Sequence, residues 1–323
     1  MKHLPDCKNY AQLNYTRINY AQINYAQLIK TNAPKIIILL EHGLGNKLST
    51  LACGLFFAKK HGIKDVIIIY TQSIHEVEEC YNLSLFTNAP LHIMQPHDIN
   101  ILLNKKDPNK IIINTTSSAH KYNHKNPAKI IVWTDFYAIF DYLKNDNYTK
   151  KFFQKLYHKI YKYNPKVTIK NDTNNYSIGV HVRLGDFLKQ NISNNDIYKF
   201  LILRPSYYID RINNITDSFI KIHGNKTTLR VYFFSDNTNN FIEKHILPYI
   251  SISNVIIPKE ISAIDSLVAL SRCDFLVLSE STFSTTAMLL KRTIGLEYYP
   301  SWRIKKEVAH KYAMTSDDLA IYF

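Results

Sequence analysis

Short runs of aliphatic and β-branched residues alternate with amphipathic segments along most of the chain. In the first half, the strand-like runs are KIIILL (35–40), DVIIIY (65–70), KIIIN (110–114) and KIIVW (129–133). Runs that are apolar throughout are typical of parallel strands buried on both faces of a sheet. Between the first two runs, segment 46–60 has apolar residues at the spacing of one helix face. This half therefore predicts a parallel sheet covered by helices.

A second alternating series follows Asn164-Pro165 and the polar segment 171–175, which together predict a domain junction. Its strand-like runs are YSIGVHV (176–182), LRVYFFSD (229–236), NVIIP (254–258) and DFLVLS (274–279), and its predicted helices are 206–220 and 262–273. Two such series favour an α/β protein of two Rossmann-like domains. We expect an N-terminal tail at 1–34, one domain at 35–165 and a second at 166–323.

The predicted tail contains a five-residue repeat at 9–28, with the copies NYAQL, NYTRI, NYAQI and NYAQL. A period of five matches neither the 3.6-residue period of a helix nor the two-residue period of a strand. We therefore expect the repeat to lie outside the fold.

Several classes of protein are disfavoured by composition. No apolar run approaches the roughly 18 to 20 residues that span a bilayer, and the N-terminus lacks the apolar core of a secretory signal. The four cysteines are far apart, which disfavours disulfides and zinc sites. These features predict a soluble cytoplasmic protein without an integral membrane segment.

The formal net charge of +14 favours a phosphate-bearing or polyanionic ligand, but it also follows from the general abundance of Lys in this chain. The lysines are scattered, and no basic stripe with interleaved aromatic residues is present. We therefore predict no nucleic-acid partner.

Glycine is rare, with eight residues in the chain, and two of them lie in EHGLGNKL between the first strand and its helix. Gly43, Gly45 and the adjacent Asn46 predict a turn at a helix start, where backbone amides can bind an anion or a hydroxyl group. The spacing matches neither the dinucleotide-binding fingerprint nor the phosphate loop. A simple tight turn remains the alternative.

The segment HVRLGD places three polar side chains at the end of a buried strand. His181 and Arg183 alternate with apolar residues and therefore project from one face of the strand. Arg183 lies where α/β sheets bind ligands, and its forked cation suits a diphosphate. Asp186 could hold the arginine in place. The structural alternative is an Arg–Asp pair that closes a turn.

Two further strand ends in this half are polar. Ser235 and Asp236 follow one strand, and Ser281, Thr282 and Ser284 follow another at a predicted helix start. Hydroxyls and amides at a helix start suit phosphate oxygens. Helix capping is the alternative for each residue taken singly.

In combination these segments resemble the fucosyltransferases, most closely the α-1,2-fucosyltransferases of glycosyltransferase family eleven. HVRLGD resembles the family's H-x-R-R-x-D motif, and GLGNK its G-x-G-N-Q. SYYIDRI resembles its tyrosine pair, FFSD its F-S-D-D, and SESTFSTTA its S-S-F-S segment. The matches occur in the family's order over residues 36 to 297.

The resemblance implies a GT-B-like fold of two facing Rossmann-like domains, with GDP-fucose in the C-terminal domain and the acceptor on the N-terminal side. It implies inverting transfer without a metal or cofactor. Arg183 would bind the β-phosphate with His181 beside it, and Asp236 would contact the nucleoside. Residues 281–283 would line the phosphate and sugar, and Asn46 would face donor and acceptor.

The resemblance thus predicts fucose transfer from GDP-fucose to a glycan hydroxyl, as an α-1,2 linkage to a galactoside, with Asp186 and His42 as candidate bases. Three departures leave alternatives open: Leu184 replaces the second arginine, Lys47 replaces glutamine, and Thr285-Thr286 replace two tryptophans. The alternatives are a protein O-fucosyltransferase, which keeps one arginine, another nucleotide-sugar transferase, or a degenerate glycan-binding module.

Overall fold

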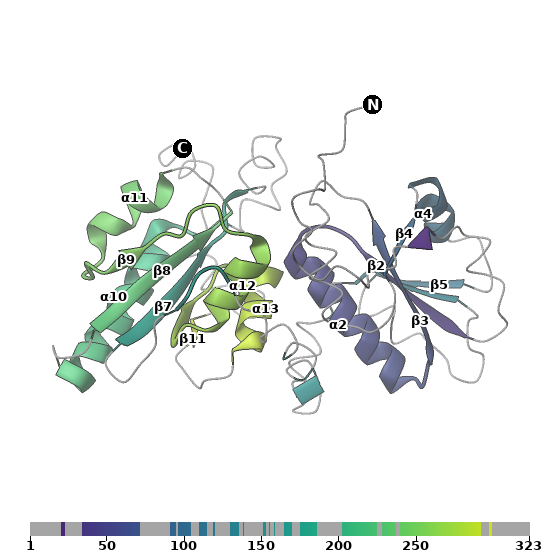
Figure 1. Cartoon of the computed structure of the whole chain (residues 1–323), viewed down its shortest axis with the longest axis horizontal. Helices are drawn as coiled ribbons and strands as arrows, with labels where there is room; N and C mark the ends of the chain where they lie inside the picture. Colours follow the sequence, from purple (N-terminus) through teal and green to yellow (C-terminus); the bar gives the residue numbers. More distant parts are fainter. Residues whose placement is uncertain are drawn as a thin grey trace. The chain divides into compact units, whose positions relative to one another are not determined.

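The computed structural model of the chain is shown in Figure 1. It describes residues 21–22, 34–71, 91–94, 96–104, 110–114, 130–135, 165–169, 175–185, 202–224, 228–236, 240–291 and 297–298, with 119, 138, 151–152, 155 and 158. The chain divides into two compact units, Met1–Thr149 and Lys150–Phe323. The sequence-based boundary at 165/166 and the tail at 1–34 stay predictions.

The described part of the first unit is a parallel sheet with helices. Its strands are β1 (Ala21–Gln22), β2 (Lys35–Leu40), β3 (Asp65–Thr71), β4 (Leu91–Met94), β5 (Lys110–Ile113) and β6 (Ile130–Trp133), and its helices are α2 (Leu44–Lys60) and α4 (Pro96–Leu103). The strand order is β1-β4-β3-β2-β6-β5, and every pair is parallel. The central strand β2 is buried along its whole length.

Both faces of β2 are covered, which explains its uninterrupted apolar sequence. Ile37 and Leu39 pack in one cluster with Leu102 of α4. Ile38 points to the opposite face, where a Cβ atom on Gly54 of α2 would lie 2.8 Å from its side chain. The absence of a side chain at Gly54 therefore lets α2 pack closely on the sheet.

Two residues of the N-terminal repeat join this sheet, so the expectation that the repeat lies outside the fold is wrong for these residues. Ala21 and Gln22 form β1 and pair in parallel with His92 and Ile93 of β4. Pairing at a sheet edge uses only backbone amides and carbonyls. The side-chain period of the repeat therefore does not decide whether it can pair.

The described part of the second unit is a second parallel sheet. Its strands are β7 (Asn175–Val182), β8 (Thr228–Ser235), β9 (Val255–Ile256), β10 (Phe275–Val277) and β11 (Glu297–Tyr298), and its helices are α10 (Pro205–His223), α11 (Phe241–His245), η3 (Leu247–Tyr249), α12 (Ala263–Ser271) and α13 (Thr282–Leu290). The order is β11-β10-β7-β8-β9.

Residues of β7 alternate between two helix layers. Ile178, Val180 and Val182 pack in a core cluster with the buried side of α10. Gly179 faces α12, where a Cβ atom would lie 2.8 Å from Leu270 Cδ1. His181 has the same parity as Gly179, so it points toward the helices that follow β9 and β10.

The predicted α/β class with two Rossmann-like domains is confirmed by these two parallel sheets with their helices. The helices predicted at 46–60, 206–220 and 262–273 correspond to α2, α10 and α12. Ser262 caps α12 as its spacing to Asp265 predicted, with its Oγ 3.1 Å from the Asp265 amide.

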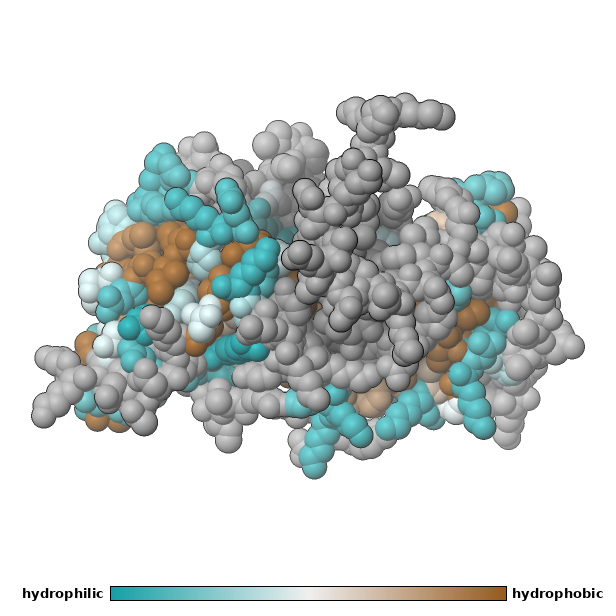
Figure 2. All heavy atoms as spheres, viewed as in Figure 1, coloured by the Kyte–Doolittle hydropathy of each residue, from teal (hydrophilic) through white to brown (hydrophobic). Residues whose placement is uncertain are grey.

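The described surface is mixed in polarity. Figure 2 shows hydrophilic side chains beside apolar areas, with the larger apolar area on the second unit. The large apolar side chains that are exposed are Ile220, Ile222, Tyr249 and Ile256. Within the described ranges, no helix has both the length and the apolar character needed to cross a bilayer.

Candidate functional site

The polar residues of the second unit converge because three parallel strands end together. In the register of β7 and β8, Val182 lies opposite Ser235, so Arg183 and Asp236 are the first residues beyond neighbouring strand ends. On the other side of β7, Val277 of β10 lies opposite Val180. Ser279, two residues further on, therefore comes beside the end of β7. Carboxyl ends of parallel strands are the usual ligand-binding edge of such a sheet.

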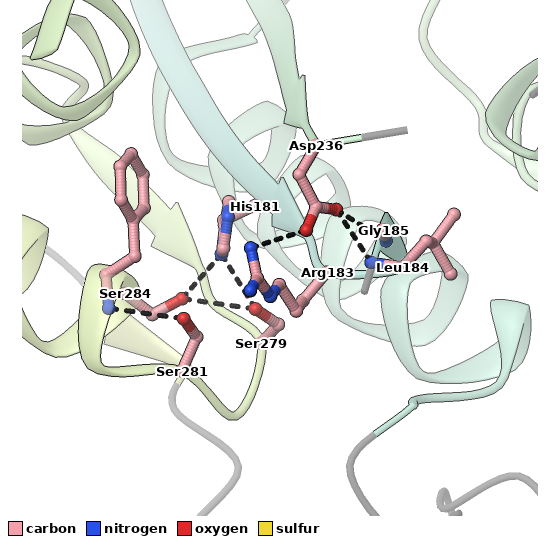
Figure 3. A network of polar contacts seen from close by, with 9 residues as sticks. His181, Arg183, Leu184, Gly185, Asp236, Ser279, Ser281 and Ser284 are labelled. Atoms are coloured by element: carbon pink, nitrogen blue, oxygen red, sulfur yellow. Dashed lines mark hydrogen bonds and ion pairs between the residues drawn. The ribbon is translucent and has the colours of Figure 1, made fainter. Parts of the chain in front are cut away.

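Arg183 forms an ion pair with Asp236 at this edge, between Nη1 and Oδ2 (Figure 3). Both side chains are about a quarter exposed, at 24% and 25%. The second carboxylate oxygen of Asp236 accepts hydrogen bonds from the backbone N–H groups of Leu184 and Gly185, each at 2.9 Å. The arginine thus has a carboxylate partner, and this residue directly follows β8. Asp186, the partner predicted from the sequence, lies outside the described residues.

The residues after Arg183 explain why this carboxylate can come so close. Leu184 is 1% exposed and packs in the core cluster of the second unit. Its side chain thus fills a core position where the family motif has a second arginine. A Cβ atom on Gly185 would lie 2.5 Å from Asp236 Oδ2, so only glycine fits there without a shift.

His181 is buried in a cluster of hydroxyl groups. Its Nδ1 lies 2.7 Å from Ser279 Oγ and 2.8 Å from Ser284 Oγ, and the two hydroxyls are 3.2 Å apart. Its ring stacks on Phe283 with centroids 4.8 Å apart. Burial lowers the pKa of His181 to about 4; Asp236 opposes this shift and Arg183 adds to it. The imidazole is therefore neutral at neutral pH.

Ser279 is a site residue that the sequence did not single out. It is 1% exposed and follows β10 directly after Leu278. The signal that could have identified it is a small polar residue at the end of an apolar strand. Whether that strand lies next to the HVRLGD strand is decided only by the order of strands in the sheet.

The start of α13 combines capping with the hydroxyl cluster. Ser281 is the N-cap, and its Oγ accepts a hydrogen bond from the Phe283 amide at 3.2 Å. Capping therefore accounts for Ser281, whereas Ser284 turns toward His181. Thr285 and Thr286 are buried and donate to the backbone carbonyls one turn earlier. At these two positions α13 therefore has small, internally bonded side chains instead of the family's tryptophans.

Two tyrosines of α10 hold the strand ends from the other face of the sheet. Tyr207 donates its hydroxyl hydrogen to the backbone oxygen of Leu278, at 3.0 Å. Tyr208 is hydrogen-bonded to the backbone of Arg183. Burial raises the pKa of Tyr208, with smaller contributions from Tyr207 and Asp236, and the Arg183 bond opposes the rise. The tyrosine pair thus fixes the residues that flank the site.

The predicted residues Gly43, Gly45 and Asn46 belong to the first unit, at the carboxyl end of β2. Gly43 is the N-cap of α2 and has no side-chain cap, and the preceding His42 is exposed with a φ of 66°. Asn46 is half-buried in the first turn. This strand end therefore presents backbone amides and an exposed imidazole.

Lys47, where the family motif has glutamine, is fully buried in the same turn. Its Nζ lies 3.0 Å from the Tyr70 hydroxyl of β3 and 4.5 Å from the centroid of that ring. Its backbone amide closes the helix turn on the oxygen of Gly43. Lys47 thus links the start of α2 to the end of β3.

Within the part of the chain that the structure describes, no group of three or more His, Cys, Asp or Glu side chains is arranged to hold a metal ion. Arg183 and the first turn of α13 are the features of the second unit suited to an anion.

Comparisons with known proteins give one family and several similar structures. A model of glycosyl transferase family 11 matches residues 129–311, more than half of the 323 residues. No curated protein matches the chain.

The similar structures are distant. The α-1,6-fucosyltransferase NodZ from Bradyrhizobium, crystallised with GDP, is 13% identical over 80% of this chain and 93% of NodZ, with a TM-score of 0.39. POFUT1 in complex with GDP is 12% identical over 83% and 98%, with a TM-score of 0.40. The E. coli heptosyltransferase WaaC with ADP is 14% identical over 80% and 85%, with a TM-score of 0.37.

Proposed function

Because the chain belongs to glycosyltransferase family 11, we propose that it transfers fucose from GDP-fucose to a hydroxyl group of a glycan acceptor. The finer form of the proposal is inverting transfer that makes an α-1,2 linkage to a galactoside. We assign the donor to the C-terminal domain at 166–323 and the acceptor side to the domain at 35–165, where Gly43, Gly45 and Asn46 lie.

The observation that carries the proposal is the position of Arg183. Its guanidinium lies at the carboxyl end of β7, in the same sheet whose β10 leads into α13. A forked cation can hold a diphosphate through two parallel hydrogen bonds and neutralise the charge that develops as the diphosphate leaves. The amides at the start of α13 can add to that stabilisation.

The reaction replaces one bond at the anomeric carbon. The acceptor oxygen forms a bond to C1 of fucose as the bond from C1 to the β-phosphate oxygen breaks, and the electron pair leaves with GDP. The acceptor hydroxyl loses its proton to a base, for which Asp186 and His42 are the candidates. His181 stays neutral and orients Ser279 and Ser284 beside the phosphate-binding arginine.

The remaining candidates have simple roles. The family resemblance assigns Ser235 and Asp236, at the end of β8, to the nucleoside, and it assigns Ser281, Thr282, Phe283 and Ser284, at the start of α13, to the phosphate and sugar. Since Arg183 and helix amides supply the positive charge, we expect transfer without a metal cofactor. Activity should therefore persist in excess chelator.

Calorimetry tests the donor. The protein should bind GDP-fucose, and a UDP- or ADP-sugar should bind at least about tenfold more weakly, a difference of about 1.4 kcal/mol. Release of GDP in the presence of a galactoside panel then tests the reaction. Preference for UDP would overturn the donor, and retained glycan binding without turnover would indicate a binding module.

A protein O-fucosyltransferase is the second candidate, and the burial of Leu184 favours it. With Leu184 in the core, HVRLGD contributes a single arginine, which is the pattern of that group of enzymes. Folded protein domains with exposed Ser or Thr should then be fucosylated in preference to free galactosides. Comparison of the two acceptor classes at equal concentration distinguishes the candidates.

A further inference from the structure

We propose that Asp236 is a positioning residue that holds Arg183 and the Leu184–Gly185 turn ready for the diphosphate, and is not a ligand of the nucleoside. The proposal rests on the proposed function, because it concerns the same donor site. It replaces the nucleoside contact that family resemblance implies for Asp236 with a role taken from its contacts.

The oxygen atoms of Asp236 are already used by the motif of β7. Oδ2 pairs with Arg183 Nη1, and Oδ1 accepts from the amides of Leu184 and Gly185, each at 2.9 Å (Figure 3). A carboxylate has about four lone-pair sites, and three of these are directed at consecutive residues of one segment. The carboxylate therefore organises this turn.

Two features of the fold bring Asp236 close to Arg183: the register of two strands and the absence of a side chain at Gly185. The parallel register of β7 and β8 sets Val182 opposite Ser235, so Asp236 leaves its strand beside Arg183. Gly185 then leaves room for the carboxylate, because a Cβ atom there would lie 2.5 Å from Oδ2. Both the strand order and the glycine are needed to bring the carboxylate to the arginine.

Other contacts already fix the backbone of Arg183, and Asp236 fixes its side chain. Tyr208 is hydrogen-bonded to its backbone, and the adjacent Leu184 is anchored in the core. The ion pair with Asp236 then orients the long side chain. An arginine fixed before the ligand arrives loses less conformational freedom on binding.

The two roles differ in which ligand they affect. A contact between Asp236 and the nucleoside would strengthen the binding of GMP and of GDP equally, because both ligands contain guanosine. A positioning residue would act through Arg183 and thus on the β-phosphate, which only GDP has. The ratio of the dissociation constants of GMP and GDP therefore separates the two roles.

Asp236→Asn is the first variant, because it keeps an acceptor oxygen for the two amides and removes the charge that faces the guanidinium. We expect GDP to bind about tenfold more weakly and GMP to change less than about twofold, as for the loss of one charged hydrogen bond. Asp217→Asn, an exposed carboxylate on α10, is the matched control and should change neither constant.

A double-mutant cycle makes the test specific. In an Arg183→Ala background, adding Asp236→Asn should lower the affinity for GDP by less than about twofold. The reason is that Asp236 acts through the arginine, which is then missing. Gly185→Ala is a second variant should Asp236→Asn not fold. This variant keeps the Asp236 side chain, but its new methyl group displaces the carboxylate. It should therefore also lower the ratio of the GMP dissociation constant to that of GDP.

Equal weakening of GMP and GDP with additive effects in the cycle would overturn the proposal, as would unchanged binding of both ligands by Asp236→Asn. A wild-type protein that binds GDP no better than GMP would instead refute the proposed contact between Arg183 and the β-phosphate. Failure of the positioning role is thus distinguishable from failure of the proposed function.

Discussion

In the proposed donor site, Arg183 has to perform with one guanidinium what the family motif does with two arginines. Its neighbours are arranged accordingly: Leu184 is buried in the core and Asp236 fixes the charged head. A guanidinium can bond a carboxylate on one edge and still direct other N–H groups at an anion, because its five donors lie in one plane. The ammonium group of lysine is compact and does not have two separate edges for two partners.

Arg183→Lys should therefore lose most of the GDP affinity although it keeps the charge. We expect a decrease of about tenfold for Lys and a larger one for Ala, which also leaves Asp236 without its cation. Isothermal calorimetry with GDP measures both. Arg272→Lys, at the end of α12, is the control for a general effect of the exchange. If Arg183→Lys bound GDP with wild-type affinity, a single positive charge without the forked geometry would be sufficient for GDP binding.

His181 gives the protein a defined response to acid. Its pKa of about 4 in the fold lies below the ordinary value of 6.5, mainly because the ring is buried. As the pH falls below 6.5 the unfolded chain takes up the proton first. The free energy of unfolding should thus be unaffected by this group above pH 6.5 and should decrease from pH 6.5 toward pH 4.

Urea unfolding of wild type and His181→Asn at a series of pH values measures this contribution. The variant should lose part of the decrease between pH 6.5 and 4, since it has no imidazole to protonate. His223→Asn, at an exposed position at the end of α10, is the control for the exchange of histidine for asparagine. An identical pH dependence in wild type and His181→Asn would contradict the buried, neutral state of His181.

At the scale of elements, β2, β3, β5 to β10 and the helices α2, α10 and α12 could be predicted because their sequence patterns are local, whereas β1, β4, α4 and β11 were missed. KIIILL is apolar throughout because β2 is covered on both faces, and α10 extends only a few residues beyond the predicted 206–220. The strand ends at Arg183 and Asp236 were also predictable. Each follows the last apolar residues of a strand.

The partner of Arg183 could not be predicted in the same way. Asp186 is near in sequence, whereas Asp236 directly follows β8 and reaches Arg183 because β8 lies next to β7. Ser279 meets His181 because β10 lies on the other side of β7. Strand order depends on packing of the whole sheet, so a residue pattern along one strand does not contain it.

Hydrogen bonds of two tyrosines connect helix α10 to the strand ends at the site. Tyr208→Phe removes the hydroxyl that bonds the Arg183 backbone, and Tyr207→Phe leaves the Leu278 oxygen without that donor. Each should lower the free energy of unfolding by about 1 to 3 kcal/mol, as for a buried polar group that loses its partner. Chemical denaturation followed by circular dichroism measures this.

The two variants should differ in function. Tyr208→Phe should weaken GDP more than Tyr207→Phe, because only Tyr208 bonds the arginine itself. Tyr249→Phe, at a residue that is 65% exposed, should change neither stability nor binding. Equal effects of the two buried tyrosines on GDP affinity would show that α10 supports the site only through general stability.

At the scale of the whole molecule, each unit has its own parallel sheet, and its candidate residues lie at strand ends of that sheet. The first unit offers the turn at Gly43, and the second offers Arg183 and the start of α13. If GDP binds the second unit, its binding energy stabilises that unit directly. A ligand stabilises only states that bind it, by an amount that grows with its concentration relative to the dissociation constant.

Hydrogen exchange with and without GDP therefore tests which unit holds the donor. At about 100 times the dissociation constant, amides of β7, β8 and β10 that exchange through opening of the second unit should slow by about 100-fold. Amides in the middle of β2 should slow much less. In Arg183→Ala the difference should shrink, because less GDP is bound. Protection centred on β2 and α2 would move the donor to the first unit, and Arg183 would then have no part in phosphate binding.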